Sequence, residues 1–204
     1  MQLDQNVKQT LKEGPKRIGL KVYRTFGTVN ENSLPIFLLW AHTQPKSIYL
    51  DFLALSNKLF NSLPTIIIDD VAPRLVESRS PEEQEKITRN FKEFFDKQGC
   101  SSVVLSEVFD NDEFEKFTER IKIQRMIHAL PKASLEKLKN GDIAAQTMHF
   151  KSNMYALLVG LRYGNVLLTS KKNIGIFFAF YEAYKKIKPG TPLGAVFCEQ
   201  EDLQ

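Results

Sequence analysis

The stretch that decides the fold reads Pro64-Thr65-Ile66-Ile67-Ile68-Asp69-Asp70-Val71-Ala72-Pro73. Its run of β-branched residues is typical of a strand that is buried on both faces of a sheet. Such strands occur mainly in parallel sheets that helices cover on both sides. The run then ends in two adjacent carboxylates, at the point where the strand emerges. We therefore expect Asp69 and Asp70 to lie at the carboxyl edge of a parallel sheet, where ligands bind in open α/β folds.

Strand and helix patterns alternate on either side of this stretch. Residues 34–40 form a second continuous apolar run, and residues 48–60 carry apolar side chains at three- and four-residue steps. Ser80, Pro81 and Glu83 mark a helix start, with a capping hydroxyl, a proline at the first helical position and a capping-box glutamate. We expect strands at 17–26, 34–40, 65–68, 101–105, 164–168 and 193–198, and helices at 3–13, 48–60, 81–98, 111–129, 134–139, 143–161 and 173–187. This order predicts an α/β, Rossmann-like three-layer fold with a mostly parallel sheet and helices on both faces.

Length and composition favour one globular domain that spans residues 1–204. The chain is 43% hydrophobic and 25% charged, which excludes a disordered chain. Cys100 and Cys198 lie far apart without metal-ligand spacing, which favours a reducing compartment over a disulfide scaffold or a zinc site. The polar N-terminus and the absence of a long apolar run predict a cytoplasmic protein without a membrane segment. The net charge of +4 comes with a basic second half, which suits contact with a polyanion, although solvated helix faces explain it as well.

A polar connection follows the expected strand at residues 34–40 and precedes the expected helix at 48–60. Its polar side chains include His42, Thr43, Gln44 and Ser47. A helix N-terminus beside a strand end binds phosphate through free backbone amides and the helix dipole. An ordinary loop with a capping hydroxyl has the same composition, so both interpretations stay open.

The two aspartates also allow two interpretations. Adjacent strand residues point to opposite faces, so the two carboxylates are not expected to share one site. Either Asp69 or Asp70 faces a ligand, or both accept hydrogen bonds from turn amides before Pro73. The sequence does not decide which of the two would face the crevice.

The common catalytic and phosphate-binding motifs are absent from the sequence. It contains no glycine-rich dinucleotide fingerprint and no P-loop lysine motif. His128 and His149 lie on expected helices, where a lone histidine is usually structural. No Ser-His-Asp or Cys-His order is present, and no metal site is expected. The sequence therefore leaves open whether the protein is an enzyme.

Residues 34–125 resemble the nucleotide-binding domain of class I aminoacyl-tRNA synthetases of the tyrosyl and tryptophanyl type. The resemblance rests on a strand, a polar turn and a helix, then a strand that ends in Asp, a Ser-Pro-Glu-Glu helix start, and a strand that runs into Ser106-Glu107. It implies that Thr43–Ile48 takes the place of the ATP-binding HIGH signature. It also implies that Asp69 or Asp70 would take a ribose hydroxyl or an amine.

Further residues receive roles from the same resemblance. Tyr155 takes the place of the tyrosine on the helix that holds the amino acid in this family, although Val159 replaces the glutamine that follows it. The segment Thr169-Ser170-Lys171-Lys172 lies near the position of the family's Gly-x-Asp-Gln strand end and echoes its mobile KMSKS loop. Lys171 and Lys172 would accordingly bind phosphate. ATP is the cofactor that the resemblance implies, and full amino acid activation is not expected because the signatures are incomplete.

The chain also resembles the tRNA-dependent cyclodipeptide synthases, which share this fold and lack ATP chemistry. Their size is similar, and Leu105-Ser106-Glu107 followed by a charged helix looks like theirs. This resemblance implies a nucleophilic hydroxyl from Thr43 or Ser47, while Val159 stands where that family has a glutamate.

Three functions follow as expectations. The first is a synthetase-like domain that binds a nucleotide or the acceptor end of tRNA. The second is a non-catalytic interaction or oligomeric scaffold protein, for which the aromatic run within residues 177–184 offers a surface beyond the core. The third is a transferase that resembles cyclodipeptide synthases. Nucleotide binding, oligomerisation in solution and a covalent aminoacyl intermediate would distinguish them.

Overall fold

The computed structural model describes residues 19–40, 47–73, 79–119 and 143–200, so the expected helices at 3–13 and 134–139 lie outside it. Its strands are β1 (Leu20–Phe26), β2 (Pro35–Trp40), β3 (Thr65–Asp69), β4 (Ser102–Val104), β5 (Val166–Ser170) and β6 (Gly194–Gln200). Its helices are α2 (Ile48–Phe60), α4 (Pro81–Lys97), α5 (Asn111–Glu119), α7 (Ile143–Gly160) and α8 (Ile174–Ile187). Two short 3₁₀ turns are η1 (Leu105–Glu107) and η4 (Lys171–Asn173).

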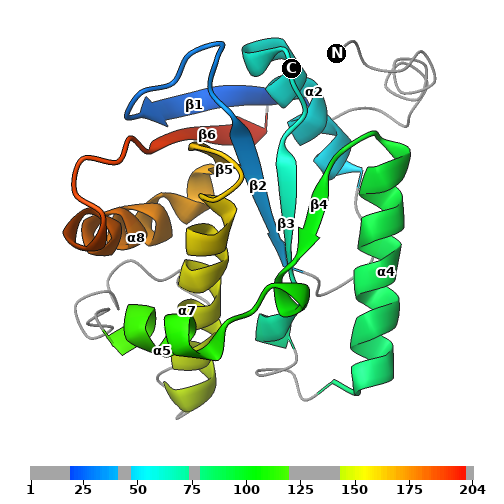
Figure 1. Cartoon of the computed structure of the whole chain (residues 1–204). Helices are drawn as coiled ribbons and strands as arrows, with labels where there is room; N and C mark the ends of the chain where they lie inside the picture. Colours follow the sequence, from blue (N-terminus) through cyan, green and yellow to red (C-terminus); the bar gives the residue numbers. More distant parts are fainter. Residues whose placement is uncertain (1–18, 41–46, 74–78, 120–142, 201–204) are drawn as a thin grey trace.

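The six strands form one sheet in the order β1-β6-β5-β2-β3-β4. The strands from β2 to β6 run parallel to one another, which confirms the expected mostly parallel α/β sheet. The edge strand β1 pairs with β6 in the antiparallel direction (Figure 1). The chain builds β2, β3 and β4 outward in one direction and then returns to place β5 on the other side of β2. This reversal makes the gap between β2 and β5 the topological switch point of the sheet.

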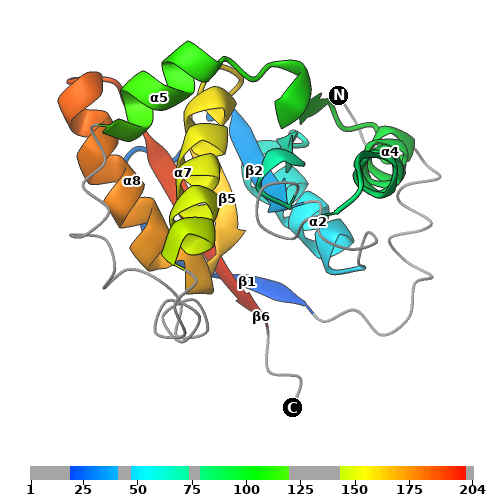
Figure 2. The same cartoon turned by 90° about the horizontal axis from the view of Figure 1, so that it is seen from below.

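Helices cover both faces of the sheet, which gives the expected three layers. Seen from below, α5, α7 and α8 lie on one side of the strands, while α2 and α4 lie on the other (Figure 2). The three isoleucines of β3 show how the sequence creates this arrangement. Ile67 packs into the core on the α7 side, and Ile66 and Ile68 pack into the core on the α2 side. Because strand side chains alternate, a strand covered on both faces needs apolar residues at every position.

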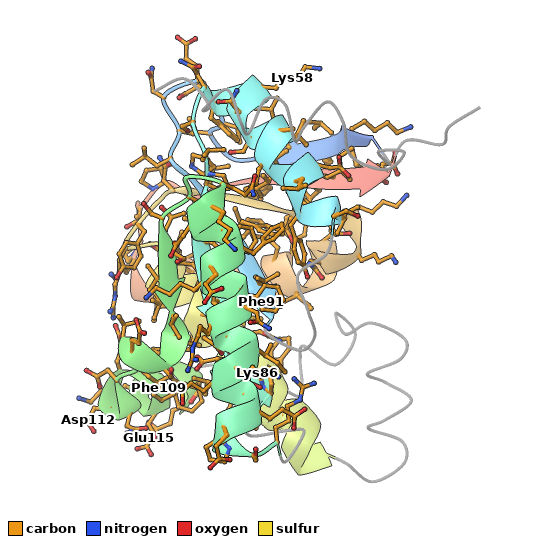
Figure 3. The ribbon with its side chains drawn as sticks, turned by 90° about the vertical axis from the view of Figure 1, so that its right-hand side faces the viewer. Lys58, Lys86, Phe91, Phe109, Asp112 and Glu115 are labelled. Carbon is orange, nitrogen blue, oxygen red and sulfur yellow. The ribbon has the colours of Figure 1, made fainter. Side chains whose placement is uncertain are left out.

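The helix signals in the sequence are confirmed where the structure describes them. Helix α2 has the predicted bounds, and α4 begins at Pro81 with the Ser80 hydroxyl accepting a hydrogen bond from the Glu83 amide at 3.2 Å. On α4, Phe91 is fully buried and Lys86 is exposed (Figure 3). This separation is the amphipathic pattern that a surface helix requires.

Several strands differ from the sequence prediction, and β4, β5 and β1 show the clearest differences. Strand β4 ends at Val104 because residues 105–107 turn into η1, which the backbone hydrogen bond from Val108 to Leu105 closes. Strand β5 begins two residues later than expected because Gly164 and Asn165 form the turn that precedes it. The antiparallel direction of β1 was not predicted. Within the described ranges, no helix is long and apolar enough to cross a bilayer.

Candidate functional site

The carboxyl ends of the parallel strands meet at one edge of the sheet. Strands β2 and β3 run side by side with Trp40 paired to Asp69, so the expectation that they end at the same edge is confirmed. A cavity lies at the switch point, between β2, β5, α7 and α8. Its volume is about 40 Å³, which is the space that the centre of a water molecule can occupy. Its walls are formed by Leu38, Asn153, Leu157, Leu167, Thr169, Asn173, Ile176 and Phe177. This is the position at which open α/β sheets bind ligands.

The cavity is mostly apolar and has three polar side chains. Two of them satisfy each other, because the Asn173 amide nitrogen donates to the Thr169 hydroxyl at 2.8 Å. The third is Asn153 on α7, which is 2% exposed. Its Oδ1 accepts no hydrogen bond from any residue that the structure describes. A buried acceptor of this kind is rare in native proteins.

Asp69 is completely buried at the end of β3. Its Oδ1 accepts hydrogen bonds from the Val71 and Ala72 amides at 3.1 and 3.0 Å, in the manner of a helix N-cap. The Ser152 hydroxyl of α7 donates to the same carboxylate at 3.3 Å. Burial raises the pKa of Asp69 to about 6, an effect that the nearby Asp70 carboxylate reinforces and the backbone hydrogen bonds oppose. Asp69 therefore fixes the turn after β3 to α7.

Asp70 is also completely buried, and it contacts a different element. It accepts hydrogen bonds from the Ser106 amide at 3.0 Å and from the Ser106 hydroxyl at 2.6 Å. Asp70 thereby joins the end of β3 to η1, which follows β4. Both aspartates thus accept hydrogen bonds from groups of the chain itself, and neither side chain is exposed to solvent.

Tyr155 is fully buried on α7, and its hydroxyl points toward the N-terminus of α5 rather than lining the switch-point cavity. The hydroxyl donates to Glu113 at 2.8 Å and accepts from the Asp110 amide at 3.2 Å. Asp110 also caps α5 through the Glu113 amide, and Arg162 pairs with the Glu113 carboxylate. In a capping box, the Glu113 carboxylate would accept directly from the Asp110 amide. In the structure the Tyr155 hydroxyl lies between the Asp110 amide and the Glu113 carboxylate and forms a hydrogen bond with each. These hydrogen bonds link α5 to α7.

The two lysines after β5 have different surroundings. Lys171 forms an ion pair with Glu199 of β6, and its ammonium lies 5.4 Å from the centre of the Tyr23 ring. The hydrogen bond from Lys171 lowers the pKa of Glu199. Lys172 is exposed, and its amide donates to the Ser170 hydroxyl at 3.4 Å. Both lysines lie in η4, directly before α8 and beside the Asn173 wall of the cavity.

The polar connection after β2 is described only in part. His42, Thr43 and Gln44 lie outside the described residues. Ser47 is exposed at the N-terminus of α2, where its side chain makes no capping hydrogen bond and its carbonyl accepts from Leu50 at 2.9 Å. The ligand contacts predicted for these four residues stay predictions.

Asn153 is the cavity residue that the sequence analysis missed. On α7 it follows Lys151 and Ser152, and Ser152 and Asn153 are both buried. This short polar run within the helix was the available signal. The signal is weak, because only the three-dimensional arrangement shows that Ser152 finds a partner in Asp69 while Asn153 lines a cavity.

Metal ligands and thiols are two further kinds of group that could carry chemistry in this chain. Among the described residues, no group of three or more His, Cys, Asp or Glu side chains is placed to hold a metal ion. Cys100 and Cys198 are both buried, and burial raises the pKa of each thiol to about 12. Thiols in such surroundings are unreactive.

No family model matches the sequence, and no curated protein matches it. Solved structures do match the fold. A CDPS (cyclodipeptide synthase) from Fluoribacter dumoffii has a TM-score of 0.63 and 11% identity, covering 91% of this chain and 99% of that chain. A tyrosyl-tRNA synthetase from Archaeoglobus fulgidus, solved with L-tyrosine, has a TM-score of 0.60 and 13% identity over 81% of this chain and 55% of that chain.

A tryptophanyl-tRNA synthetase homolog from Entamoeba histolytica has a TM-score of 0.56 and 13% identity, covering 82% of this chain and 48% of that chain. The chain thus spans about half the length of these synthetases and almost the full length of the CDPS. At these identities the similarity concerns the fold. The chain therefore has a class I aminoacyl-tRNA-synthetase-like, Rossmann-like fold, which it shares with a cyclodipeptide synthase.

Proposed function

We propose that this chain binds a nucleotide, either free or as the 3′ end of tRNA, at the carboxyl edge of β2 and β5. The observation that carries the proposal is the cavity at the switch point, which lies between α7, α8 and the face of the sheet at β2 and β5 and includes the polar residues Asn153, Thr169 and Asn173 in its lining. Ligands of open α/β sheets bind at this position. Fold analogy supports a nucleotide as the ligand class, and it assigns no reaction.

Within this proposal each predicted site residue has a role. Exposed Lys172 contacts phosphate, and Lys171 supports this position through its ion pair with Glu199. His42, Thr43, Gln44 and Ser47 contribute the second polar wall. Asp69 and Asp70 hold the turns at the carboxyl edge in place through Ser152 and Ser106, and Tyr155 holds α7 against α5.

The test compares two charge reversals on exposed lysines. Lys172→Glu lies at the proposed site, whereas Lys186→Glu is the control in the last turn of α8. The full-length chain is heated with AMP, ATP, an aminoacyl-adenylate analogue and bulk tRNA. We expect wild type and K186E to be stabilised by about 2.7 kcal/mol at a hundredfold excess of ligand over Kd, and K172E to bind more weakly.

Two results would contradict the proposal. If no nucleotide and no tRNA stabilises the wild-type chain, the proposal fails. A purely oligomeric species in the same samples would then favour the scaffold function. Equal weakening by K172E and K186E would indicate non-specific attraction to the basic second half of the chain, which falls steeply with salt.

A second candidate function is favoured by one observation. The chain spans 99% of the CDPS chain but only about half of the two synthetase chains described above. A transferase of this kind would need a hydroxyl nucleophile, for which Thr43 and exposed Ser47 are the predicted residues. Incubation with labelled aminoacyl-tRNA, followed by acid quenching, would reveal a covalent aminoacyl-protein. Loss of this label in Thr43→Val or Ser47→Ala would identify the nucleophile, whereas absence of label in wild type would exclude this function.

A further inference from the structure

We infer that one face of the molecule binds single-stranded nucleic acid. This face, the β1–α8 strip, runs along the edge strand β1 (Figure 1) and the adjoining parts of η4 and α8. Its members are the basic and aromatic side chains Lys21, Tyr23, Arg24, Lys171, Tyr181 and Lys185. None of them lines the switch-point cavity, so the inference goes beyond the proposed nucleotide site.

Ring contacts at both ends of β1 connect this strand to η4 and α8. At one end, Lys171 Nζ lies 5.4 Å from the centre of the Tyr23 ring. At the other end, the centres of the Phe26 and Tyr181 rings are 4.7 Å apart, and Lys185 Nζ lies 5.5 Å from the centre of the Tyr181 ring. The seven residues of β1 extend over about 20 Å at the rise of a strand. A stacked nucleic acid strand covers this length with about six nucleotides.

Arg24 lies between the two ends of the strip and projects to the α8 side of the sheet. It pairs with Phe197 of β6, and directly paired residues of an antiparallel ladder project to the same face. The Phe197 ring contacts the rings of Phe177 and Phe178 on α8, at 5.4 and 6.5 Å between ring centres. Arg24 is exposed, so its guanidinium is accessible on the same side as the lysines of the strip.

The strip and its border have an excess of positive charge. They contain four cationic and two anionic side chains, namely Lys21, Arg24, Lys171, Lys185, Glu182 and Glu199. The difference of four and two gives a net charge of +2. Glu199 is occupied by ion pairs with both Lys21 and Lys171. Arg24 and Lys185 are exposed and form no ion pair within the described part of the chain, so both are available to phosphate groups.

Tyr23 distinguishes a nucleic acid from other polyanions. Its side chain is 53% exposed, more than any other aromatic side chain that the structure describes. The register of β1 and β6 shifts between Val22 and Arg24, so Tyr23 is the extra residue of a β-bulge. A bulge redirects its side chain and hinders a further strand from pairing with the edge. An exposed ring beside cations provides a stacking surface for an unpaired base, which a duplex or an acidic peptide cannot use.

Variants of Tyr23 test the stacking contact. The probe is a labelled single-stranded RNA of mixed sequence, about 12 nucleotides long, and its binding to the full-length chain is measured by fluorescence anisotropy. Tyr23→Ser removes the ring and should weaken binding by about fivefold to 100-fold, whereas Tyr23→Phe keeps the ring and should bind like wild type. Tyr163→Ser is the matched control, because Tyr163 is 40% exposed and lies in the turn between α7 and β5. No binding of the RNA, or equal effects of Y23S and Y163S, would overturn the inference.

The salt dependence of binding tests the phosphate contacts. Arg24→Gln and Lys185→Gln each remove one cation, and each should reduce the slope of log Kd against log salt concentration by about 0.7. Lys86→Gln is the matched control, because Lys86 is exposed on α4, which covers the other face of the sheet (Figures 2 and 3). It should leave the slope unchanged. An equal reduction in K86Q would show that the RNA is attracted by the charge of the whole chain, which contradicts a defined strip.

Three further probes separate single-stranded nucleic acid from other polyanions. They are the RNA annealed to its complement, a polyglutamate peptide of the same length, and vesicles of phosphatidylcholine with phosphatidylserine. We expect each of them to bind more weakly than the single strand and to bind wild type and Y23S equally. A peptide that binds more tightly than the RNA would indicate an acidic protein partner, and tighter binding of the vesicles would indicate a membrane surface. Either result would contradict the inference.

Stabilisation by AMP separates this inference from the proposed nucleotide function, because Tyr23 lies outside the switch-point cavity. If AMP stabilises wild type and Y23S equally while the RNA also binds both equally, the inference fails and the nucleotide proposal stands. If the RNA binds in a Tyr23-dependent manner while neither AMP nor ATP stabilises the chain, the inference stands and the proposed site at the cavity loses its support.

Discussion

At the scale of single residues, Asp69 makes the stability of the fold depend on pH. Burial raises its pKa from the ordinary 3.8 to about 6, so the folded state holds a proton that the unfolded chain has already released between these values. Stability therefore falls as the pH rises through this window. At about 1.4 kcal/mol for each pKa unit, the loss is about 3 kcal/mol. This loss of stability is complete above about pH 6 and absent below about pH 4.

We predict that Asp69→Asn removes this dependence. Asparagine keeps an oxygen that accepts from the Val71 and Ala72 amides, and it does not ionise. Urea unfolding at about pH 7.5 should show D69N at least as stable as wild type, and the advantage should vanish near about pH 4. Asp69→Ala is the control that loses the acceptor at both pH values. Two results together would contradict the assignment. The stability of wild type would rise from the lower to the higher pH, and D69N would be less stable than wild type at the higher pH.

Tyr155 illustrates a second interaction at this scale. Tyr155→Phe removes the hydrogen bond to the Glu113 carboxylate and leaves the Asp110 amide without its acceptor. We expect a loss of about 1.5–3 kcal/mol in chemical denaturation. Tyr184→Phe is the control, because Tyr184 is buried on α8 and its hydroxyl makes no hydrogen bond within the described part of the chain. If Y155F and Y184F changed the free energy of unfolding equally, the Tyr155 hydroxyl would add no specific stability. The ring, which both substitutions keep, would then hold α7 against α5.

At the scale of elements, the turn that joins α7 to β5 sets the start of β5 beside β2. Gly164 lies in this turn, and a Cβ there would stand 2.4 Å from the Leu34 carbonyl oxygen and 2.6 Å from Ile36 Cγ2. We expect Gly164→Ala to destabilise the fold by about 2–3 kcal/mol through this overlap. A Cβ at Gly190 would meet no atom within 4 Å. Gly190→Ala should therefore lower the free energy of unfolding only through the strain of its φ of +81°, by about 1–2 kcal/mol. Thermal unfolding of both variants tests this order, and a G164A protein as stable as wild type would contradict the close approach.

The elements are also the scale at which the sequence was most informative. Local signals set the bounds of α2 and the start of α4, because apolar spacing and the Ser80 cap act within a few residues. The β-branched run identified β3 for the same reason. The direction of β1 could not be predicted in this way. Its pairing with β6 joins Leu20 to Gln200, and no pattern within β1 records a partner so distant along the chain.

The end of β4 shows a related limit of sequence patterns. The apolar run predicted a strand through Leu105, but the chain turns into η1 after Val104. The cause is a contact with Asp70, which accepts hydrogen bonds from the amide and the hydroxyl of Ser106. A turn that depends on a carboxylate 36 residues earlier is invisible to a local pattern.

At the scale of the whole molecule, the reversal of the chain between β4 and β5 creates the candidate site. The sequence predicted the sheet and placed polar residues at its carboxyl edge. It did not predict the cavity, because Leu38, Asn153 and Thr169 meet only when β5 returns beside β2 and α7 crosses above both. The two aspartates that mark this edge most clearly in the sequence hold its turns in place, while the cavity residue Asn153 lies on α7, where the sequence offered only Tyr155 as a candidate site residue.

The most direct measurement of the central claim is amide hydrogen exchange of the full-length chain with and without a non-hydrolysable aminoacyl-adenylate analogue. The account predicts added protection around the switch point, in residues 38–40, 153–157 and 167–177, with α4 and β1 unchanged. Protection confined to α4 or β1, or no change at any ligand concentration, would contradict the claim that the gap between β2 and β5 is a nucleotide-binding site.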